Sequence, residues 1–178
     1  MFDSELDLSV LDNTTIRIAG AMTESIVDGT GIRYVIFTQG CPFHCKGCHN
    51  PQAQTLFGGM DVKLRVLYDE FEDNPLIKGV TFSGGEPFIQ TGPLTILAKF
   101  LKKKGYSVWS YSGYTYDKLV NDPIRRRLLE QLDVVVDGPF VMAKKSIDLD
   151  FRGSSNQRII NVQESLKQNK VVLMEGFN

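Results

Sequence analysis

Three cysteines lie within eight residues of this chain, in the stretch CPFHCKGC at residues 41–48. They are Cys41, Cys45 and Cys48, and the sequence contains no other cysteine. Thiolates bind soft or borderline metals, so three of them in one short segment predict a metal centre. Iron–sulfur clusters and structural zinc sites usually take four protein ligands. The pattern is therefore one ligand short, and the fourth position has to be explained.

Two kinds of metal site in which the protein supplies all four ligands, a zinc site and an electron-transfer cluster, do not fit this spacing well. A zinc site would need His44 or His49, the only histidines, as its fourth ligand. Zinc sites usually draw two ligand pairs from separate segments, and the sequence has no second pair. A cluster that only transfers electrons normally has four cysteines. The spacing favours a cluster with one open iron, which binds substrate or cofactor. A non-catalytic zinc-binding interaction module remains the alternative from a different class.

Composition and charge exclude several other kinds of protein. The chain has 178 residues, 42% hydrophobic and 23% charged, which suits one globular domain. Its net charge of −1 predicts neither a nucleic-acid partner nor a membrane surface. No apolar run approaches the roughly 18 residues of a membrane span. The acidic N-terminus lacks the features of a signal peptide, so we expect a cytoplasmic protein. There, clustered cysteines are more often metal ligands or catalytic groups than disulfides.

The elements that must position the cysteines alternate between strands and helices. Strand patterns cover residues 14–20, 32–40, 78–85, 106–113 and 133–138, and residues 157–162 and 170–177 are candidates for late strands. Helical patterns cover residues 61–71, 93–104 and 116–132, the last broken at Pro123. Residues 1–13 predict a polar tail, and residues 139–156 predict a loop.

This order of elements predicts an α/β fold with mostly parallel strand pairing. A full (β/α)₈ barrel typically needs about 250 residues. We expect five or six strands from this chain, and therefore an incomplete, open TIM-like β/α barrel. We expect it to form a single domain over residues 14–178.

Polar or glycine residues follow several of the predicted strands, where such folds carry their chemistry. The cysteines follow one strand, and the other strand ends carry Ser83, Gly84, Gly85, Ser112, Gly113, Asp137 and Gly138. Paired glycines let a ligand approach the backbone closely, although most such pairs only mark turns. Glu86 adds a carboxylate that suits an ammonium group. Four such strand ends on one rim predict a shared site.

Two of these stretches resemble the radical S-adenosylmethionine (radical SAM) enzymes. CPFHCKGC is similar to their Cys-x3-Cys-x2-Cys loop, and SGGEP is similar to their Gly-Gly-Glu motif. The resemblance implies that Cys41, Cys45 and Cys48 hold a [4Fe–4S] cluster whose fourth iron binds the amino and carboxylate groups of SAM. It implies that the methionine end of SAM is bound by Ser83, Gly84, Gly85 and Glu86.

One feature departs from the commonest pattern of that superfamily. The residue before the third cysteine is often aromatic there and is Gly47 here, so no side chain at this position contacts adenine. The backbone of Gly47, Cys48 and His49 can approach the adenine instead. We expect His44 and His49 to lie beside the cluster or to face solvent rather than to bind metal.

Asp137 is a further candidate, because it ends a predicted strand. Its carboxylate can hold the SAM ribose or a cation near the SAM carboxylate. The alternative is an aspartate that caps the turn before Gly138.

Further stretches narrow the resemblance to the activating enzymes of glycyl radical proteins. DGTGIRYVIFTQGC resembles the segment that leads into the cluster in those enzymes. WSYSGY, VVVDGPF and FRGSSNQRII together resemble the activating proteins of anaerobic ribonucleoside-triphosphate reductases, and the resemblance covers roughly residues 14–160. An activating enzyme of the pyruvate formate-lyase type is the alternative. Arg152, in the last of these stretches, can pair with a carboxylate or bind a partner's backbone; the alternative is a capped loop before a strand.

The resemblance also implies a mechanism. A small electron donor such as flavodoxin or ferredoxin reduces the cluster, and SAM is cleaved to methionine and a 5′-deoxyadenosyl radical. This radical takes a hydrogen atom from a glycine of the reductase subunit. The chemistry is borne by the cofactors, so no side chain is expected to act as a catalytic acid or base.

Overall fold

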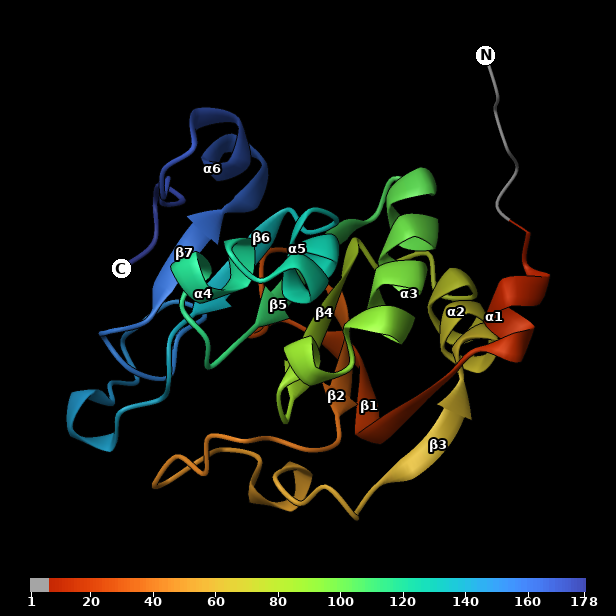
Figure 1. The fold of residues 1–178 in the computed structure, drawn as a ribbon, viewed down its shortest axis with the longest axis horizontal. Helices are drawn as coiled ribbons and strands as arrows, with labels where there is room; N and C mark the ends of the chain where they lie inside the picture. The colour runs from red at the N-terminus through yellow and green to blue at the C-terminus, as the bar shows by residue number, and fades with distance from the viewer. Residues whose placement is uncertain (1–6) are drawn as a thin grey trace.

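The computed structural model describes residues 7–178 and shows a curved, open, seven-stranded sheet with helices packed along one side (Figure 1). Its strands lie in the order β3-β1-β2-β4-β5-β6-β7. Their bounds are β1 (Thr15–Ser25), β2 (Arg33–Thr38), β3 (Met60–Lys63), β4 (Gly79–Gly84), β5 (Ser107–Tyr111), β6 (Val134–Asp137) and β7 (Arg158–Asn161). The predicted α/β class and open sheet are confirmed, and the described strands number seven rather than five or six.

The four central strands are parallel, and the outer strands are antiparallel. Strands β2, β4, β5 and β6 run in one direction, while β1 pairs with β2 and β3, and β7 with β6, in antiparallel fashion. The parallel strands are buried on both faces, as the apolar runs in their sequences require. Tyr34, Val35 and Ile36 of β2, for example, are all fully buried.

The helices follow the predicted pattern closely in the middle of the chain. They are α1 (Ser9–Asn13), α2 (Leu64–Glu72), α3 (Thr91–Lys103), α4 (Tyr116–Val120), α5 (Pro123–Leu129) and α6 (Val162–Gln168), with 3₁₀ turns η1 (Pro51–Ala53), η2 (Pro87–Ile89) and η3 (Met142–Lys144). The predicted break at Pro123 is confirmed. Pro123 opens α5, and the Asp122 carboxylate caps it by accepting from the backbone N–H groups of Ile124 and Arg125.

Three segments differ from the sequence prediction. Residues 9–13, expected within the polar tail, form α1, because Leu11 is fully buried in the main core; residues 1–6 of that expected tail lie outside the described residues. Residues 60–63 form β3 along β1, so the expected helix begins only at Leu64. The expected strand at 170–177 does not form. Residues 162–168, for which no helix was expected, form α6. In the segment after α6, Leu173 makes an isolated β-bridge with Ile160 of β7.

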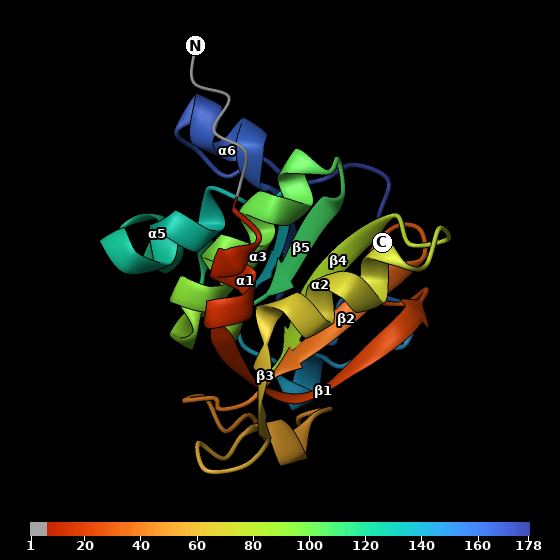
Figure 2. The same cartoon turned by 90° about the vertical axis from the view of Figure 1, so that its right-hand side faces the viewer.

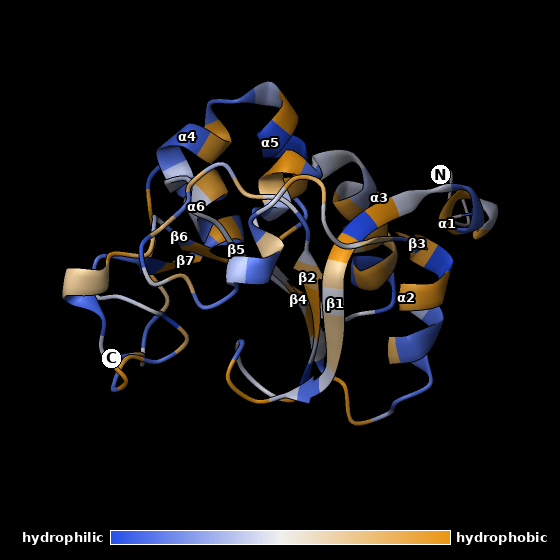
Figure 3. Ribbon diagram, turned by 90° about the horizontal axis from the view of Figure 1, so that it is seen from below, coloured by the Kyte–Doolittle hydropathy of each residue, from blue (hydrophilic) through white to orange (hydrophobic). Residues whose placement is uncertain are grey.

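Two hydrophobic clusters fill the two sides of the sheet. The larger lies between the sheet and the helices, and the smaller comprises Trp109, Val134, Val136 and Ile159. Figure 3 shows the hydrophobic central strands β2 and β4, and helices that carry both hydrophobic and hydrophilic residues. This division is typical of helices that bury one face against a sheet.

Strand register brings the candidate residues to one edge. The β2–β4 pairing runs from Arg33 opposite Gly79 to Thr38 opposite Gly84, so the two strands end level. Strand β7 begins opposite the end of β6, with Arg158 beside Asp137. In Figures 1 and 2 the segment after β2, coloured orange to yellow, projects at the bottom, away from α3, α5 and α6.

Candidate functional site

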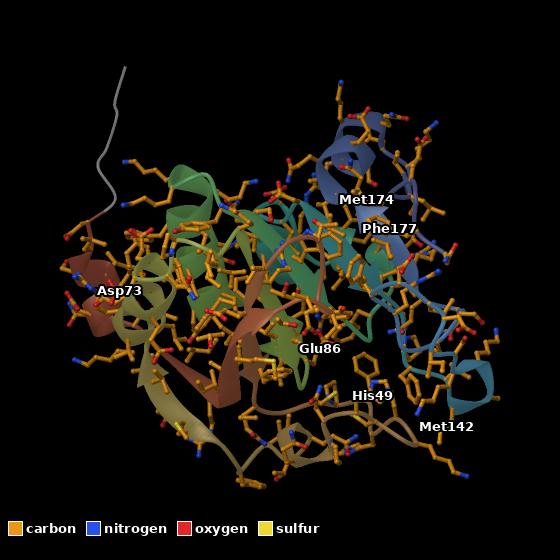
Figure 4. The ribbon with its side chains drawn as sticks, turned by 180° about the vertical axis from the view of Figure 1, so that it is seen from behind. His49, Asp73, Glu86, Met142, Met174 and Phe177 are labelled. Atoms are coloured by element: carbon orange, nitrogen blue, oxygen red, sulfur yellow. The ribbon has the colours of Figure 1, made fainter. Side chains whose placement is uncertain are left out.

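A cavity of about 900 Å³ lies at the carboxyl ends of the parallel strands. This volume is near the top of the roughly 300–1,000 Å³ range of small-molecule sites. Its wall includes Cys41, Cys45, Cys48, His49, Ser83, Gly84, Gly85, Glu86, Ser112, Gly113 and Gly138. Figure 4 shows Glu86 and His49 beside the same region, coming from different segments. The structure therefore brings together the strand ends that the sequence predicted to share a rim.

The cysteine loop is a tight turn without regular secondary structure. The Cys48 N–H donates to the Cys45 carbonyl oxygen at 3.1 Å, and the Cys48 sulfur accepts from the Asn50 N–H at 3.4 Å. His44 and Gly47 have φ angles of +46° and +74°, in the left-handed region. These turns leave all three cysteines half-buried and lining the cavity.

Phe43 attaches this loop to the end of β5. Its ring packs edge-on against Tyr114, with 4.7 Å between the ring centroids. A Cβ atom at Gly113 would lie only 2.4 Å from the Phe43 ring. Gly113 is therefore a glycine because the cysteine loop packs directly on it.

The three cysteines line the cavity without any histidine, aspartate or glutamate, among the residues that the structure describes, that completes a metal-binding group with them. Over residues 7–178, no group of three or more His, Cys, Asp or Glu side chains could hold one. His49 packs against Phe140 instead, with 5.0 Å between ring centroids. In a four-iron cluster each thiolate binds a different iron, so the thiols need to line a space rather than meet at a point. The three cysteines fit a [4Fe–4S] cluster with one iron left open.

Gly84 and Gly85 bring the end of β4 against the start of the cysteine loop. A Cβ atom at Gly85 would lie 2.2 Å from the Gly40 carbonyl oxygen, and Gly84 has a φ of +96°. The N–H groups of Gly85 and Glu86 donate to the carbonyl oxygens of Thr38 and Gly40, both at 2.8 Å. These bonds hold the end of β4 directly against the start of the cysteine loop, beside the cavity.

The Glu86 carboxylate is the most constrained acceptor in the wall. It is 1% exposed and accepts from the Phe88 N–H at 3.0 Å, the Ser112 hydroxyl at 3.0 Å and the Gly113 N–H at 2.7 Å. A carboxylate accepts about four hydrogen bonds, so roughly one acceptor position remains. Burial raises the pKa of Glu86 to about 7, although these three bonds and Arg125 oppose the rise.

The surroundings of the Cys41 thiol disfavour a free thiolate at this position. Burial raises the pKa of the Cys41 thiol, and the charges of Glu86, Cys45 and Cys48 raise it further, against a backbone hydrogen bond at Phe43. A bound metal reverses this balance, because it stabilises the coordinating thiolate.

Asp137 has other partners in the structure. Its carboxylate accepts from the Tyr116 N–H at 2.6 Å, at the start of α4, and from the Arg158 guanidinium at 3.0 Å and 2.5 Å. Asp137 is 1% exposed and does not line the cavity, whereas Gly138 does. These contacts join the Asp137 carboxylate to the start of α4 and to β7 rather than to the turn before Gly138. A role of Asp137 in SAM binding stays a prediction.

Two wall segments were not predicted as site residues. One is the β6–β7 loop, which contributes Phe140 and residues between 145 and 157. The other is the β1–β2 loop, which contributes Ile26, Val27 and Asp28. The available signals were the unassigned FRGSSNQ run and the exposed apolar pair before Asp28. Both become informative only once the fold places them at the cavity.

Comparisons with known proteins agree with this geometry. Residues 27–160 match the family model described as a 4Fe-4S single cluster domain. The anaerobic ribonucleoside-triphosphate reductase-activating protein of Pasteurella multocida is 33% identical over 143 residues, covering 75% of this chain and 90% of that protein. Its namesake from Haemophilus influenzae is 31% identical over 142 residues, with the same coverage. The pyruvate formate-lyase-activating enzyme of Clostridium pasteurianum is 36% identical over 106 residues, covering 56% of this chain and 44% of that enzyme.

Proposed function

Because the chain belongs to the family of 4Fe-4S single cluster domain proteins, we propose that it activates an anaerobic ribonucleoside-triphosphate reductase by generating a glycyl radical on it. The observation that carries this proposal is one cavity that joins three cysteine thiols to the Gly84–Glu86 strand end. Three thiols would hold a [4Fe–4S] cluster with one iron lacking a protein ligand, and the Glu86 carboxylate beside them would bind an ammonium group. Both are features that SAM binding requires.

The residues of this chain bind and orient, and the cofactors supply the reaction. When bound, the cluster and SAM supply reductive cleavage of SAM to a 5′-deoxyadenosyl radical, which removes a hydrogen atom from a glycine. Cys41, Cys45 and Cys48 hold three irons of the cluster. Ser83, Gly84, Gly85 and Glu86, which line the cavity beside the thiols, would bind the methionine end of SAM. A positive charge there keeps Glu86 ionised in spite of its burial.

The backbone of Gly47, Cys48 and His49 is proposed to face the adenine. It lies on the turn that bounds the cavity, and Cys48 and His49 line the wall.

The partner is a protein, and the cavity mouth offers it an apolar rim. Ile26 and Val27 of the β1–β2 loop and Ile147 of the β6–β7 loop line the cavity and are 72%, 69% and 92% exposed. Apolar side chains this exposed around one opening are typical of an interaction site. We propose that a glycine-containing loop of the reductase enters between them.

A small redox protein, flavodoxin or ferredoxin, is the proposed electron donor, and the proposed location is the cytoplasm. No helix of residues 7–178 is both long enough and apolar enough to cross a membrane.

Electron paramagnetic resonance tests the function directly. Anaerobically reconstituted protein is reduced and mixed with SAM and the reductase, and a glycyl doublet on the reductase is the expected result. Cys45→Ala serves as the control, because it removes a cluster ligand and should abolish both cluster and doublet. A parallel sample with pyruvate formate-lyase tests the alternative partner, which the partial match to its activating enzyme supports. Stoichiometric zinc without acid-labile sulfide would refute the radical function altogether.

A further inference from the structure

The loop between β6 and β7, residues 138–157, is held in shape by its own side chains. Gln157 connects the end of the loop to its start. Its Oε1 atom accepts from the N–H groups of Gly153 at 2.9 Å and Ser154 at 3.1 Å, and its Nε2 atom donates to the Gly138 carbonyl oxygen at 3.1 Å. One side chain therefore fixes three backbone groups.

Neighbouring residues of the FRGSSNQ run reinforce this arrangement. The fully buried Ser154 accepts from the Val141 N–H at 3.1 Å through its hydroxyl oxygen. The Asn156 side chain donates to the Pro139 carbonyl oxygen at 2.8 Å, and Arg152 donates to the Gln157 carbonyl oxygen at 3.2 Å. Within the loop, one short 3₁₀ turn and an isolated bridge between Lys145 and Ser154 supply a few backbone hydrogen bonds, and these side-chain bonds add to them.

The braced loop lies directly on the turn that carries the third cysteine. A Cβ atom at Gly47 would lie 2.8 Å from the Met142 sulfur, and the Phe140 ring packs on His49. A Cβ atom at Gly153 would lie 3.0 Å from the Phe140 ring and 3.4 Å from His49. Figure 4 shows Met142 and His49 on the two facing segments. Met142 and Phe140 therefore contact the residues on either side of Cys48, and the absence of side chains at Gly47 and Gly153 leaves room for these contacts.

The cysteine turn needs such support. Among the residues of the turn 41–48, all of which the structure describes, a single backbone hydrogen bond forms, from Cys48 to Cys45, and two residues have positive φ. Ordering each residue costs about 1–2 kcal/mol of backbone entropy, so an unsupported turn would sample many conformations. A loop that merely covered the sheet edge would not need to contact the residues on either side of a metal ligand.

We propose that loop 138–157 is a clamp on the cluster, with Gln157 as its positioning residue. Braced by Gln157, the loop holds Met142 and Phe140 against Gly47 and His49. This contact keeps Cys48 in its ligating position and shields that side of the cluster from solvent. The inference rests on the proposed function only in requiring the cluster, and it is independent of SAM and of the protein partner.

The test measures how fast the cluster is lost. Gln157→Leu removes all three hydrogen bonds of the side chain at similar volume. Reconstituted protein is exposed anaerobically to an iron chelator, and loss of the cluster absorption is followed. We expect loss about tenfold faster than in the wild type, the effect of roughly one or two lost hydrogen bonds. The electron paramagnetic resonance line shape of the reduced cluster should also change.

Gln163→Leu is the matched control. The Gln163 side chain also bonds to backbone, donating to the carbonyl oxygens of Glu130 at 3.1 Å and Leu132 at 2.6 Å, and it does not line the cavity. Its cluster should be lost at the wild-type rate with an unchanged line shape. An unchanged rate in Gln157→Leu, or equal acceleration in both variants, would overturn the proposal.

Two further variants keep the test decisive if Gln157→Leu does not fold. Met142→Ala removes the contact with Gly47, and because the Met142 side chain is half-exposed, the hydrogen bonds of Gln157 should stay intact. This variant should lose its cluster about threefold faster than the wild type. Gln157→Glu keeps the acceptor for the Gly153 and Ser154 N–H groups and should fall between the wild type and Gln157→Leu. Wild-type rates in both would refute the clamp. A failed radical assay with normal clamp behaviour would refute the proposed function alone.

Discussion

At the scale of single residues, Glu86 shows how one side chain serves both fold and site. It joins the ends of β4 and β5 by bonding to Ser112 and Gly113, and it still faces the cavity. Burial fixes the position of the Glu86 carboxylate, but it also raises the free energy of the ionised form when no cation is nearby. A ligand with an ammonium group removes this cost, so binding and local stability are coupled at this residue.

This coupling predicts a pH effect on the metal-free protein. The folded-state pKa of Glu86, about 7, lies above the ordinary value of 4.5. Between these values the folded state keeps a proton that the unfolded state has lost, so stability falls as pH rises through this window. The contribution lost by pH 7.5 is about 3 kcal/mol. Glu86→Gln cannot ionise, so its free energy of unfolding in urea should lack this fall between pH 5 and 7.5.

Glu175→Gln provides the control for that measurement. Glu175 is exposed, and its variant should follow the wild-type pH profile. If Glu86→Gln retained the wild-type fall in stability, the carboxylate would not be the group that titrates.

At the scale of elements, the cysteine loop depends on the strand ends against which it packs. The loop has little structure of its own, and Phe43 fixes it to β5 through Gly113 and Tyr114. Backbone bonds from Gly85 and Glu86 fix its start to β4. The metal ligands are therefore positioned by contacts with elements far away in the sequence.

Gly113→Ala tests this dependence. The new methyl group would lie 2.4 Å from the Phe43 ring, and the edge-on contact with Tyr114 limits how far the ring can move. We expect a loss of about 1–3 kcal/mol in stability and a lower iron content after reconstitution. Unfolding in urea and iron analysis are the two measurements.

Gly92→Ala is the matched substitution, because a Cβ atom there has no neighbour within 4 Å and the residue lies in α3. Its stability should stay within about 0.5 kcal/mol of the wild type, and it should keep full iron content. Normal iron content in Gly113→Ala would show that Phe43 does not position the loop.

At the scale of the whole molecule, the sequence predicted those elements whose residue pattern follows from their own burial. The central strands were predicted because burial on both faces requires apolar runs. Strand β3 was missed because its four residues merge with the helical pattern of α2. Helix α6 was missed because only Val162 and Ser165 of it are buried, which leaves a weak periodicity.

The candidate site likewise contains residues that the sequence predicted and contacts that only the structure shows. The cysteines and the Gly84–Glu86 motif were predicted because ligand chemistry dictates their types and spacing. The contacts of Met142 with Gly47 and of Arg158 with Asp137 depend on how the β6–β7 loop and β7 return to the rim. No pattern within either segment encodes those partners.

The apolar rim leads to a prediction about the reductase. Ile147 is 92% exposed at the cavity mouth, and burying such a side chain in an interface contributes about 1.5–3 kcal/mol. Ile147→Asp should therefore weaken binding of the reductase at least about tenfold, measured by titration with the reconstituted protein. Cluster content and SAM cleavage in the absence of the reductase should not change, because the side chain contributes to docking rather than to the cofactor site.

Phe57→Asp is the comparison, since Phe57 is also 92% exposed but does not line the cavity. If Phe57→Asp weakened binding and Ile147→Asp did not, the reductase would dock beside the cysteine loop rather than across the mouth.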